Sequence, residues 1–188
     1  RGTPAFASRW LLPRMARFNN AYPEIELQVA TTPDPTHFPN DGVDVRIQYG
    51  QEPEPGLRVA PFMTTTRFPV CSPRMLENGS AILKLEDLAQ VTLLRDLVGD
   101  NCPAWFEWAG RKMPVPIKGP QFANSEVTIR ATEEGQGAAL GYSALIAEEI
   151  ADKNLVKLFE LETPPKVIYS LSCPEAWTNR PRITAFRN

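Results

Sequence analysis

The chain has 188 residues, of which 43% are hydrophobic and 22% charged, and its formal net charge is -2. This length fits one large domain or two small lobes with a real core. This balanced charge argues against a segment that binds nucleic acid by itself, because neutralisation of phosphates by basic side chains supplies most of the binding free energy. No apolar run approaches the roughly 20 residues of a membrane helix, so we expect no membrane contact.

The first residues and the cysteines indicate the origin of the chain. Residues 1–4 contain neither an initiator methionine nor a signal peptide, which predicts an excised domain. Cys71, Cys102 and Cys173 are odd in number, far apart and without CxxC spacing. We therefore expect no disulfide framework and a reducing cytoplasm. Buried apolar packing is the favoured role of these thiols, with a reactive role left open at Cys102.

Residues 10–23 predict an amphipathic helix, because apolar side chains recur there at helical spacing. Pro13 belongs in its first turn or bends it, since proline donates no backbone hydrogen bond. Apolar and polar residues alternate over residues 25–29 and again over 43–49, which predicts two strands. Residues 33–42 between them are rich in turn formers and leave room for one short helix.

Two further strands are predicted near residues 57–62 and at 68–71. The alternation of helix and strand favours an α/β sheet with parallel strands. A short buried strand follows at residues 91–94. Residues 102–110 form a helix that closes on Gly110.

The second half repeats these patterns. A short strand is predicted at residues 120–123, and Ser125 is expected to cap a helix that runs to about residue 134. Gly135-Gln136-Gly137 ends that helix, residues 138–142 return as a strand, and Ser143 is expected to cap a helix over 144–151. Residues 167–173 form the last strand, before a helical tail. We expect two successive α/β lobes, with the last strand and tail free to return to the first lobe.

Five sequence motifs, in order along nearly the whole chain, resemble one protein family. They are FASRWLLPRM at residues 6–15, GVDVRIQYG at 42–50, FPVCSPRML at 68–76, EGQGAALG at 134–141 and PRITAFR at 181–187. Together they resemble the effector-binding domain of LysR-type bacterial transcription regulators. The subgroup they resemble most includes regulators of glycine cleavage and of β-lactamase induction.

The resemblance implies an α/β fold of two Rossmann-like lobes joined by two crossover strands, like a type 2 periplasmic binding protein. Regulatory lobe I would comprise residues 1–66 and 165–188, and regulatory lobe II residues 67–164. The family's DNA-binding helix-turn-helix domain, and most of the first strand, are absent from this chain. DNA would therefore be contacted only through that missing segment. A small-molecule effector would lie in the cleft between the lobes and change the lobe and dimer arrangement.

The expected effector-binding residues are grouped at helix starts and strand ends. They are Pro4, Ala5, Phe6, Ala7, Ser8, Thr31, Thr32, Pro33, Phe68, Asn101, Cys102, Trp105, Asn124 and Tyr142. Backbone N–H groups and the positive end of a helix dipole favour a carboxylate or an amino-acid-like compound. Taken singly, Phe68, Asn124 and Tyr142 are better explained as structural residues, whereas residues 4–8, Thr31 and Thr32 favour ligand contact. Arg67 is the cation to test first.

An enzyme, an exported solute-binding protein and an oligomerisation module are the alternatives to this function. An enzyme is disfavoured, because the single histidine, His37, lies among prolines and no GxSxG, HExxH or dinucleotide motif occurs. No catalytic residue, metal or cofactor is therefore expected. An exported solute-binding protein of a transport system would share the fold. An oligomerisation role is compatible with sensing: the family implies a homodimer through lobe I and lobe II, and a tetramer in the full-length protein.

Overall fold

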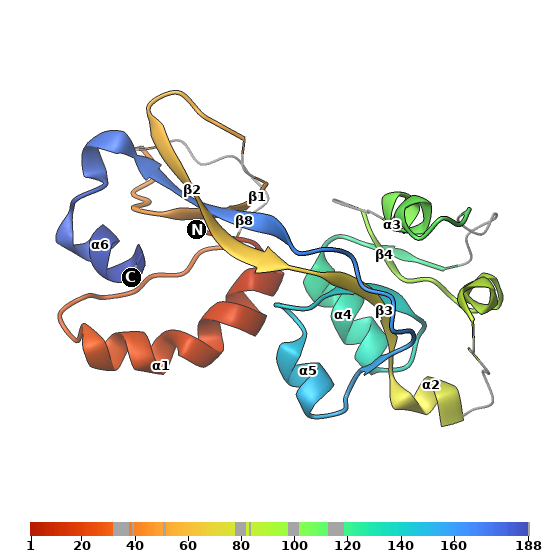
Figure 1. Cartoon of the computed structure of the whole chain (residues 1–188). Helices are drawn as coiled ribbons and strands as arrows, with labels where there is room; N and C mark the ends of the chain where they lie inside the picture. Colours follow the sequence, from red (N-terminus) through yellow and green to blue (C-terminus); the bar gives the residue numbers. More distant parts are fainter. Residues whose placement is uncertain are drawn as a thin grey trace. The chain divides into compact units, whose positions relative to one another are not determined.

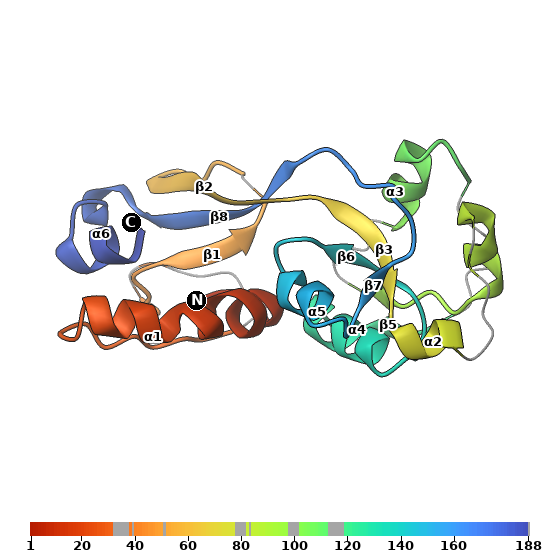
Figure 2. The same ribbon diagram turned by 60° about the horizontal axis from the view of Figure 1, so that its bottom comes forward.

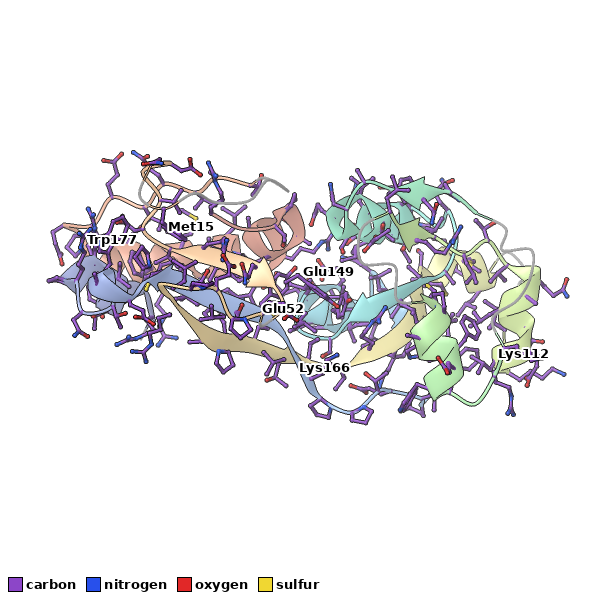
Figure 3. All side chains as sticks on the ribbon, turned by 90° about the horizontal axis from the view of Figure 1, so that it is seen from above. Met15, Glu52, Lys112, Glu149, Lys166 and Trp177 are labelled. Carbon is purple, nitrogen blue, oxygen red and sulfur yellow. The ribbon has the colours of Figure 1, made fainter. Side chains whose placement is uncertain are left out.

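A computed structural model describes residues 1–31, 38, 40–50, 52–77, 82, 84–97, 102–112 and 119–187. The chain divides into two compact units, Arg1–Thr65 with Lys166–Asn188, and Thr66–Pro165. The first unit is thus assembled from both ends of the sequence, and the second from a continuous stretch (Figure 1). Lys166, labelled in Figure 3, begins the strand that returns to the first unit.

The first unit is built on a three-stranded sheet in the order β1-β8-β2, visible side by side in Figure 2. Its elements are the π-helical turn Phe6–Leu11, α1 (Leu12–Ala21), β1 (Arg46–Tyr49), β2 (Leu57–Thr65), β8 (Lys166–Pro174), the 3-10 turn Glu175–Trp177 and α6 (Pro181–Arg187). Leu171 of the central strand faces Ile47 on one side and Ala60 on the other. Both pairings are antiparallel, so the expectation of parallel strands is wrong for this sheet. The reason is that the central strand is the late, returning part of the chain.

The predicted helix over residues 10–23 is present, but it starts earlier. Helical structure runs without a break from Pro4 to Ala21, and its second turn is π-helical. The N–H of Leu12 donates to the carbonyl of Ala7, five residues back. Pro13 follows directly and donates nothing. Pro13 thus lies in the first turn of α1, as predicted, and the π-helical turn precedes it.

The two strands predicted before and after the turn-rich loop are only partly formed. Residues 43–49 contribute the shorter strand β1, while residues 25–29 carry no strand assignment. In the part of the chain that the structure describes, the one bridge next to residues 25–29 is a parallel pair of Gly2 and Thr31. A strand requires a hydrogen-bonded neighbour as well as an alternating sequence.

The second unit contains a three-stranded antiparallel sheet, β6-β3-β7, and a parallel pair, β4-β5. Its elements are β3 (Arg67–Cys71), α2 (Pro73–Glu77), the 3-10 turn Leu85–Gln90, β4 (Arg95–Asp96), α3 (Cys102–Trp108), β5 (Gln121–Phe122), α4 (Ser125–Glu133), β6 (Ala139–Tyr142), α5 (Ala147–Ala151) and β7 (Val156–Lys157). The strand predicted at residues 91–94 is displaced to β4, and Leu93 makes only an isolated bridge to Ala138. Gly110 ends α3 as predicted, with φ +69°.

Neither of the two serines predicted as helix caps is the N-cap residue of its helix. Asn124 rather than Ser125 caps α4, because its backbone is extended and its side chain accepts a hydrogen bond from the N–H of Val127 at 3.2 Å. The Ser125 hydroxyl instead donates to Asp96 at 2.6 Å. Ser143 caps no helix, since its hydroxyl accepts the N–H of Thr66 at 3.0 Å and α5 begins later.

The three cysteines are free and buried, as packing residues would be. Burial disfavours the thiolate and raises the pKa of Cys71 to about 11. Cys102 is 6% exposed and lies in the apolar interior of the second unit. Among the described residues, none of the helices combines the length and apolar character of a bilayer span.

Candidate functional site

The helix start in the first unit is organised by hydroxyl groups. Thr3 shares a 2.9 Å hydrogen bond with the phenol of Tyr169 on β8, and its hydroxyl accepts the N–H of Phe6 at 3.4 Å. The Ser8 hydroxyl donates to the carbonyl of Pro4 at 3.0 Å. Thr3, Pro4 and Ser8 are half-buried, so their polar atoms can meet both the helix and a ligand.

The middle of this predicted segment is core. Ala5 and Phe6 are each 2% exposed and Ala7 is 7% exposed. Phe6 stacks on Trp10 with ring centroids 5.3 Å apart, and its ring centroid lies 5.7 Å from that of Phe62. Their side chains hold the helix start in place, and only backbone groups of these residues remain for a ligand.

The strand-end residues are incompletely placed. Thr31 is exposed and bridges Gly2. Thr32, Pro33 and Asn101, together with His37, lie outside the described residues. Thr31 therefore represents the predicted strand-end contact of the first unit.

In the second unit, most predicted contacts are packing residues. Trp105 is 1% exposed, and its indole N–H donates to the carbonyl of Arg67 at 3.3 Å. Phe68 is buried, with the ammonium of Lys157 4.6 Å from its ring centroid. Cys102 is buried at the first residue of α3. Asn124 uses its side-chain oxygen to cap α4.

Arg67 and Tyr142 form the most unusual polar feature of the second unit. They face each other across β3 and β6, and the guanidinium carbon lies 4.8 Å from the centre of the phenol ring. The backbone of Arg67 is fixed on both sides, because its N–H donates to Thr163 at 3.0 Å and its carbonyl accepts from Trp105. Its Nε is buried and finds no acceptor among the described residues.

Sequence reasoning missed Tyr169. It was predicted only as part of the last strand, although a tyrosine in a buried strand is a signal that its hydroxyl needs a partner. Thr3 and Tyr169 come from opposite ends of the chain, so no spacing along the sequence could pair them.

A cavity of about 590 Å³ lies entirely within the first unit, lined by α1, residues 24–30, residues 41–45 and α6. Among the predicted effector contacts that the structure describes, Phe6 and Ala7 line this cavity. The cavity overlaps the described part of the predicted site at these two residues. Over the ranges that the structure describes, no cluster of His, Cys, Asp or Glu could hold a metal ion.

Comparison with known proteins assigns the family. The model of the LysR substrate binding domain matches residues 2–188. The glycine cleavage system transcriptional activator of Escherichia coli K12 is 34% identical over 184 residues, which are 98% of this chain and 60% of the relative. The HTH-type transcriptional activator AmpR of Rhodobacter capsulatus is 33% identical over 154 residues, covering 82% of this chain and 52% of the relative. The chain thus spans about three fifths or less of these relatives.

Solved structures agree. The effector domain of the transcriptional regulator AmpR of Pseudomonas aeruginosa is 27% identical with a TM-score of 0.79, covering 99% of this chain and 89% of that one. The regulatory domain of CrgA from Neisseria meningitidis, 18% identical with a TM-score of 0.85, shares the fold over 99% of this chain and 92% of that one. The predicted two-lobed, periplasmic-binding-protein-like α/β fold is confirmed, and the relatives are named as regulators rather than enzymes. The chain belongs to the LysR substrate-binding domain family.

Proposed function

We propose that this chain is the effector-sensing part of a cytoplasmic LysR-type transcription regulator that contacts DNA through another segment. Its effector is a small anion, either a carboxylate or an amino-acid-like compound. The helix start at residues 4–8, with Thr31, contributes polar contacts from the first unit, and Arg67 contributes the cation from the second. A ligand controls such a protein only through its preference for one arrangement of the parts. A change in the lobe and dimer arrangement on effector binding stays a prediction.

The observation that carries this proposal is that the side chain of Arg67 has a buried Nε without an acceptor among the described residues. A guanidinium whose Nε is buried without an acceptor is unfavourable, because desolvation is not offset by a hydrogen bond. Stacking on Tyr142 and the doubly bonded backbone hold the group in that position. A planar, always charged guanidinium suits bidentate binding of a carboxylate. The cost in the free protein is explained if a ligand supplies the missing acceptor.

Replacing Arg67 with methionine should weaken binding of a small carboxylate at least about tenfold, since a hydrogen bond to a charged group contributes about 1.5–3 kcal/mol. Stability should stay the same or rise, because the change removes a buried polar atom without a partner. The measurement is titration calorimetry against a panel of carboxylates and amino acids, together with thermal unfolding.

Arg74→Met is the matched control, because the Arg74 side chain is 73% exposed and lies 4.0 Å from the carboxylate of Glu134. It should bind like the wild type. Equal affinities of the Arg67 variant and wild type would reject Arg67 as the cation. A loss of stability in that variant would assign it a structural role instead.

We further propose a homodimer in which α1 and residues 25–29 of one copy pack against α4 of another, with a tetramer in the full-length regulator. Large apolar side chains are exposed on these elements: Leu12 is 55% exposed, Val29 40% and Val127 44%. Glu126, Glu133 and Glu134 are acidic residues of this region that basic residues of α1 in a partner could contact. Glu133 and Glu134 already contact Arg130 of their own helix, at 3.2 and 2.7 Å. We therefore propose that apolar contact is the main interaction that stabilises the homodimer.

The dimer predicts that Val127→Asp gives a monomer at micromolar concentration, because a charge would be buried in the contact. Leu97→Asp is the control, since Leu97 is 61% exposed in the same unit but outside α4. Light scattering over a dilution series measures both. A wild-type protein that is monomeric throughout would contradict the dimer.

A further inference from the structure

The start of β3, which carries the proposed anion contact Arg67, is hydrogen-bonded to two other segments of the second unit. The N–H of Arg67 donates to the hydroxyl of Thr163 at 3.0 Å, and the N–H of Thr163 donates to the carbonyl of Arg67 at 3.0 Å. The N–H of Thr66 donates to the hydroxyl of Ser143 at 3.0 Å, and the Thr66 carbonyl accepts the N–H of Ser143 at 3.0 Å. The backbone on which the guanidinium is mounted is therefore restrained from two sides.

Arg67 and Phe68 present their side chains to opposite faces of β3, because side chains alternate along a strand. The guanidinium of Arg67 stacks on Tyr142 on one face. Phe68 lies on the other face, where it packs in a buried cluster with Val70 and Ile129. A group that contacts this second face therefore acts on Arg67 through the backbone of β3.

One ion pair contacts both sequence neighbours of Arg67. Lys157, the last residue of β7, and Glu162 lie 2.7 Å apart from Nζ to Oε2. The carboxylate of Glu162 also accepts the hydroxyl of Thr66, and the ammonium of Lys157 lies 4.6 Å from the ring centroid of Phe68. Strand β7 pairs with β3, as Figure 2 shows, which brings Lys157 to this face. The hydrogen bonds from Lys157 and then Thr66 lower the pKa of Glu162, so its carboxylate is charged at neutral pH.

This ion pair restrains a position rather than adding much stability. The side chains of Lys157 and Glu162 are 28% and 36% exposed, and a pair this open to water contributes little to folding because water and salt screen it. Its contacts with Thr66 and Phe68 lie on either side of Arg67 in the sequence. Restraint of both neighbours fixes the direction in which the Arg67 side chain leaves the backbone.

We propose that Lys157 and Glu162 are positioning residues for Arg67, which set the affinity of the anion site without contacting the ligand. This inference rests on the proposed function, in which Arg67 binds the effector. A guanidinium forms two parallel hydrogen bonds to a carboxylate only in the correct orientation, so a small displacement of its backbone weakens binding. The coupling is reciprocal: a bound carboxylate in turn favours the ordered start of β3.

Three single substitutions in the whole 188-residue chain separate positioning from charge. Glu162→Ala removes the negative charge and both of its contacts, and Thr66→Val removes the hydroxyl that Glu162 accepts without a change in charge. Glu160→Ala is the matched control, because Glu160 is 95% exposed and lies 4.0 Å from the ammonium of Lys157. Loss of a nearby negative charge alone would favour an anionic ligand, whereas loss of positioning should disfavour it. The two explanations therefore predict opposite signs.

Titration calorimetry with the panel of carboxylates should show binding about three- to tenfold weaker in Glu162→Ala and Thr66→Val. Glu160→Ala should bind like the wild type or slightly more tightly. A second measurement needs no ligand: the Nε–H signal of Arg67 in ¹⁵N NMR, assigned by its loss in Arg67→Met. Its heteronuclear NOE should fall in the same two variants and stay unchanged in Glu160→Ala, because the side chain becomes more mobile.

Unchanged affinity and an unchanged Arg67 signal in Glu162→Ala and Thr66→Val would overturn the proposal. Equal weakening by Glu160→Ala and Glu162→Ala would also overturn it, since the effect would then follow charge alone. A lower Tm in the two variants without a change in the Arg67 signal would assign the ion pair a purely structural role. If the wild type bound no carboxylate, the proposed function would fail, and the NMR signal would still decide whether the ion pair positions Arg67.

Discussion

Replacing Trp105 with alanine should lower the free energy of unfolding of the second unit by about 3–5 kcal/mol, the usual cost of removing a buried large aromatic side chain. Trp105 is 1% exposed and packs in a cluster with Cys71, Leu88 and Phe106. Its removal leaves a cavity and also deprives the carbonyl of Arg67 of the indole N–H. Urea unfolding followed by far-ultraviolet circular dichroism measures the loss.

Trp108→Ala provides the control within the same helix. Trp108 is 42% exposed, and its ring centroid is 6.2 Å from that of Trp105, so its removal should cost about 1 kcal/mol or less. The comparison also separates packing from sensing, because Trp105 belongs to the predicted effector contacts. A Trp105 variant with wild-type stability and no effector binding would contradict the packing role.

Gly137→Ala should destabilise the second unit by about 3 kcal/mol, through collision rather than through backbone strain. An added Cβ would lie 2.4 Å from the carbonyl oxygen of Thr92 and 3.0 Å from Leu94. That carbonyl cannot retreat freely, since it accepts the N–H of Ala138 at 2.9 Å, and the N–H of Leu94 donates to the Ala138 carbonyl at 2.8 Å. Equilibrium unfolding in urea, followed by circular dichroism, gives the difference.

Gly135→Ala, two residues earlier, tests the other mechanism. Gly135 has φ +76°, and the nearest atom to an added Cβ is 3.9 Å away on Arg74. Its substitution should cost about 1 kcal/mol, from the left-handed backbone alone. If the two variants lost equal stability, close approach at Gly137 would not be the cause.

These two glycines show what sequence could and could not reveal about the fold. The Gly-x-Gly pattern predicted a helix end followed by a strand, which α4 and β6 confirm. It could not indicate which glycine is pressed against a distant carbonyl. The last strand was predicted from its own residues, because it is mostly apolar and is buried from Ile168 to Cys173. Its antiparallel direction depends on where the chain returns, which local pattern does not encode.

The remaining errors in the predicted fold concern a helix cap and a strand. Asn124 and Ser125 are both good caps, and the extended backbone of Asn124 decides between them. Residues 25–29 have a strand pattern without a strand, because pairing is a property of two segments.

The candidate site was predicted unevenly. Helix starts and strand ends are visible in the sequence, and of the predicted residues there Ser8 is half-buried and Thr31 is exposed. Phe6 and Trp105 were selected by position in the family pattern, but burial is decided by packing partners elsewhere. The lack of an acceptor for the Nε of Arg67 could not be predicted, because it depends on which groups surround this atom in three dimensions.

The chain leaves the first unit after Thr65 and returns to it at Lys166, which has a consequence for folding during synthesis on the ribosome. The second unit is continuous from Thr66 to Pro165, so all of its residues emerge before β8 does. The first unit, which begins the sequence, waits for its central strand until Pro174 has been made. Until then β1 and β2 have unpaired edges, the kind of surface that invites pairing with other chains. Vectorial folding therefore runs in the reverse of the usual amino-to-carboxyl order, and the first unit is the last to become native.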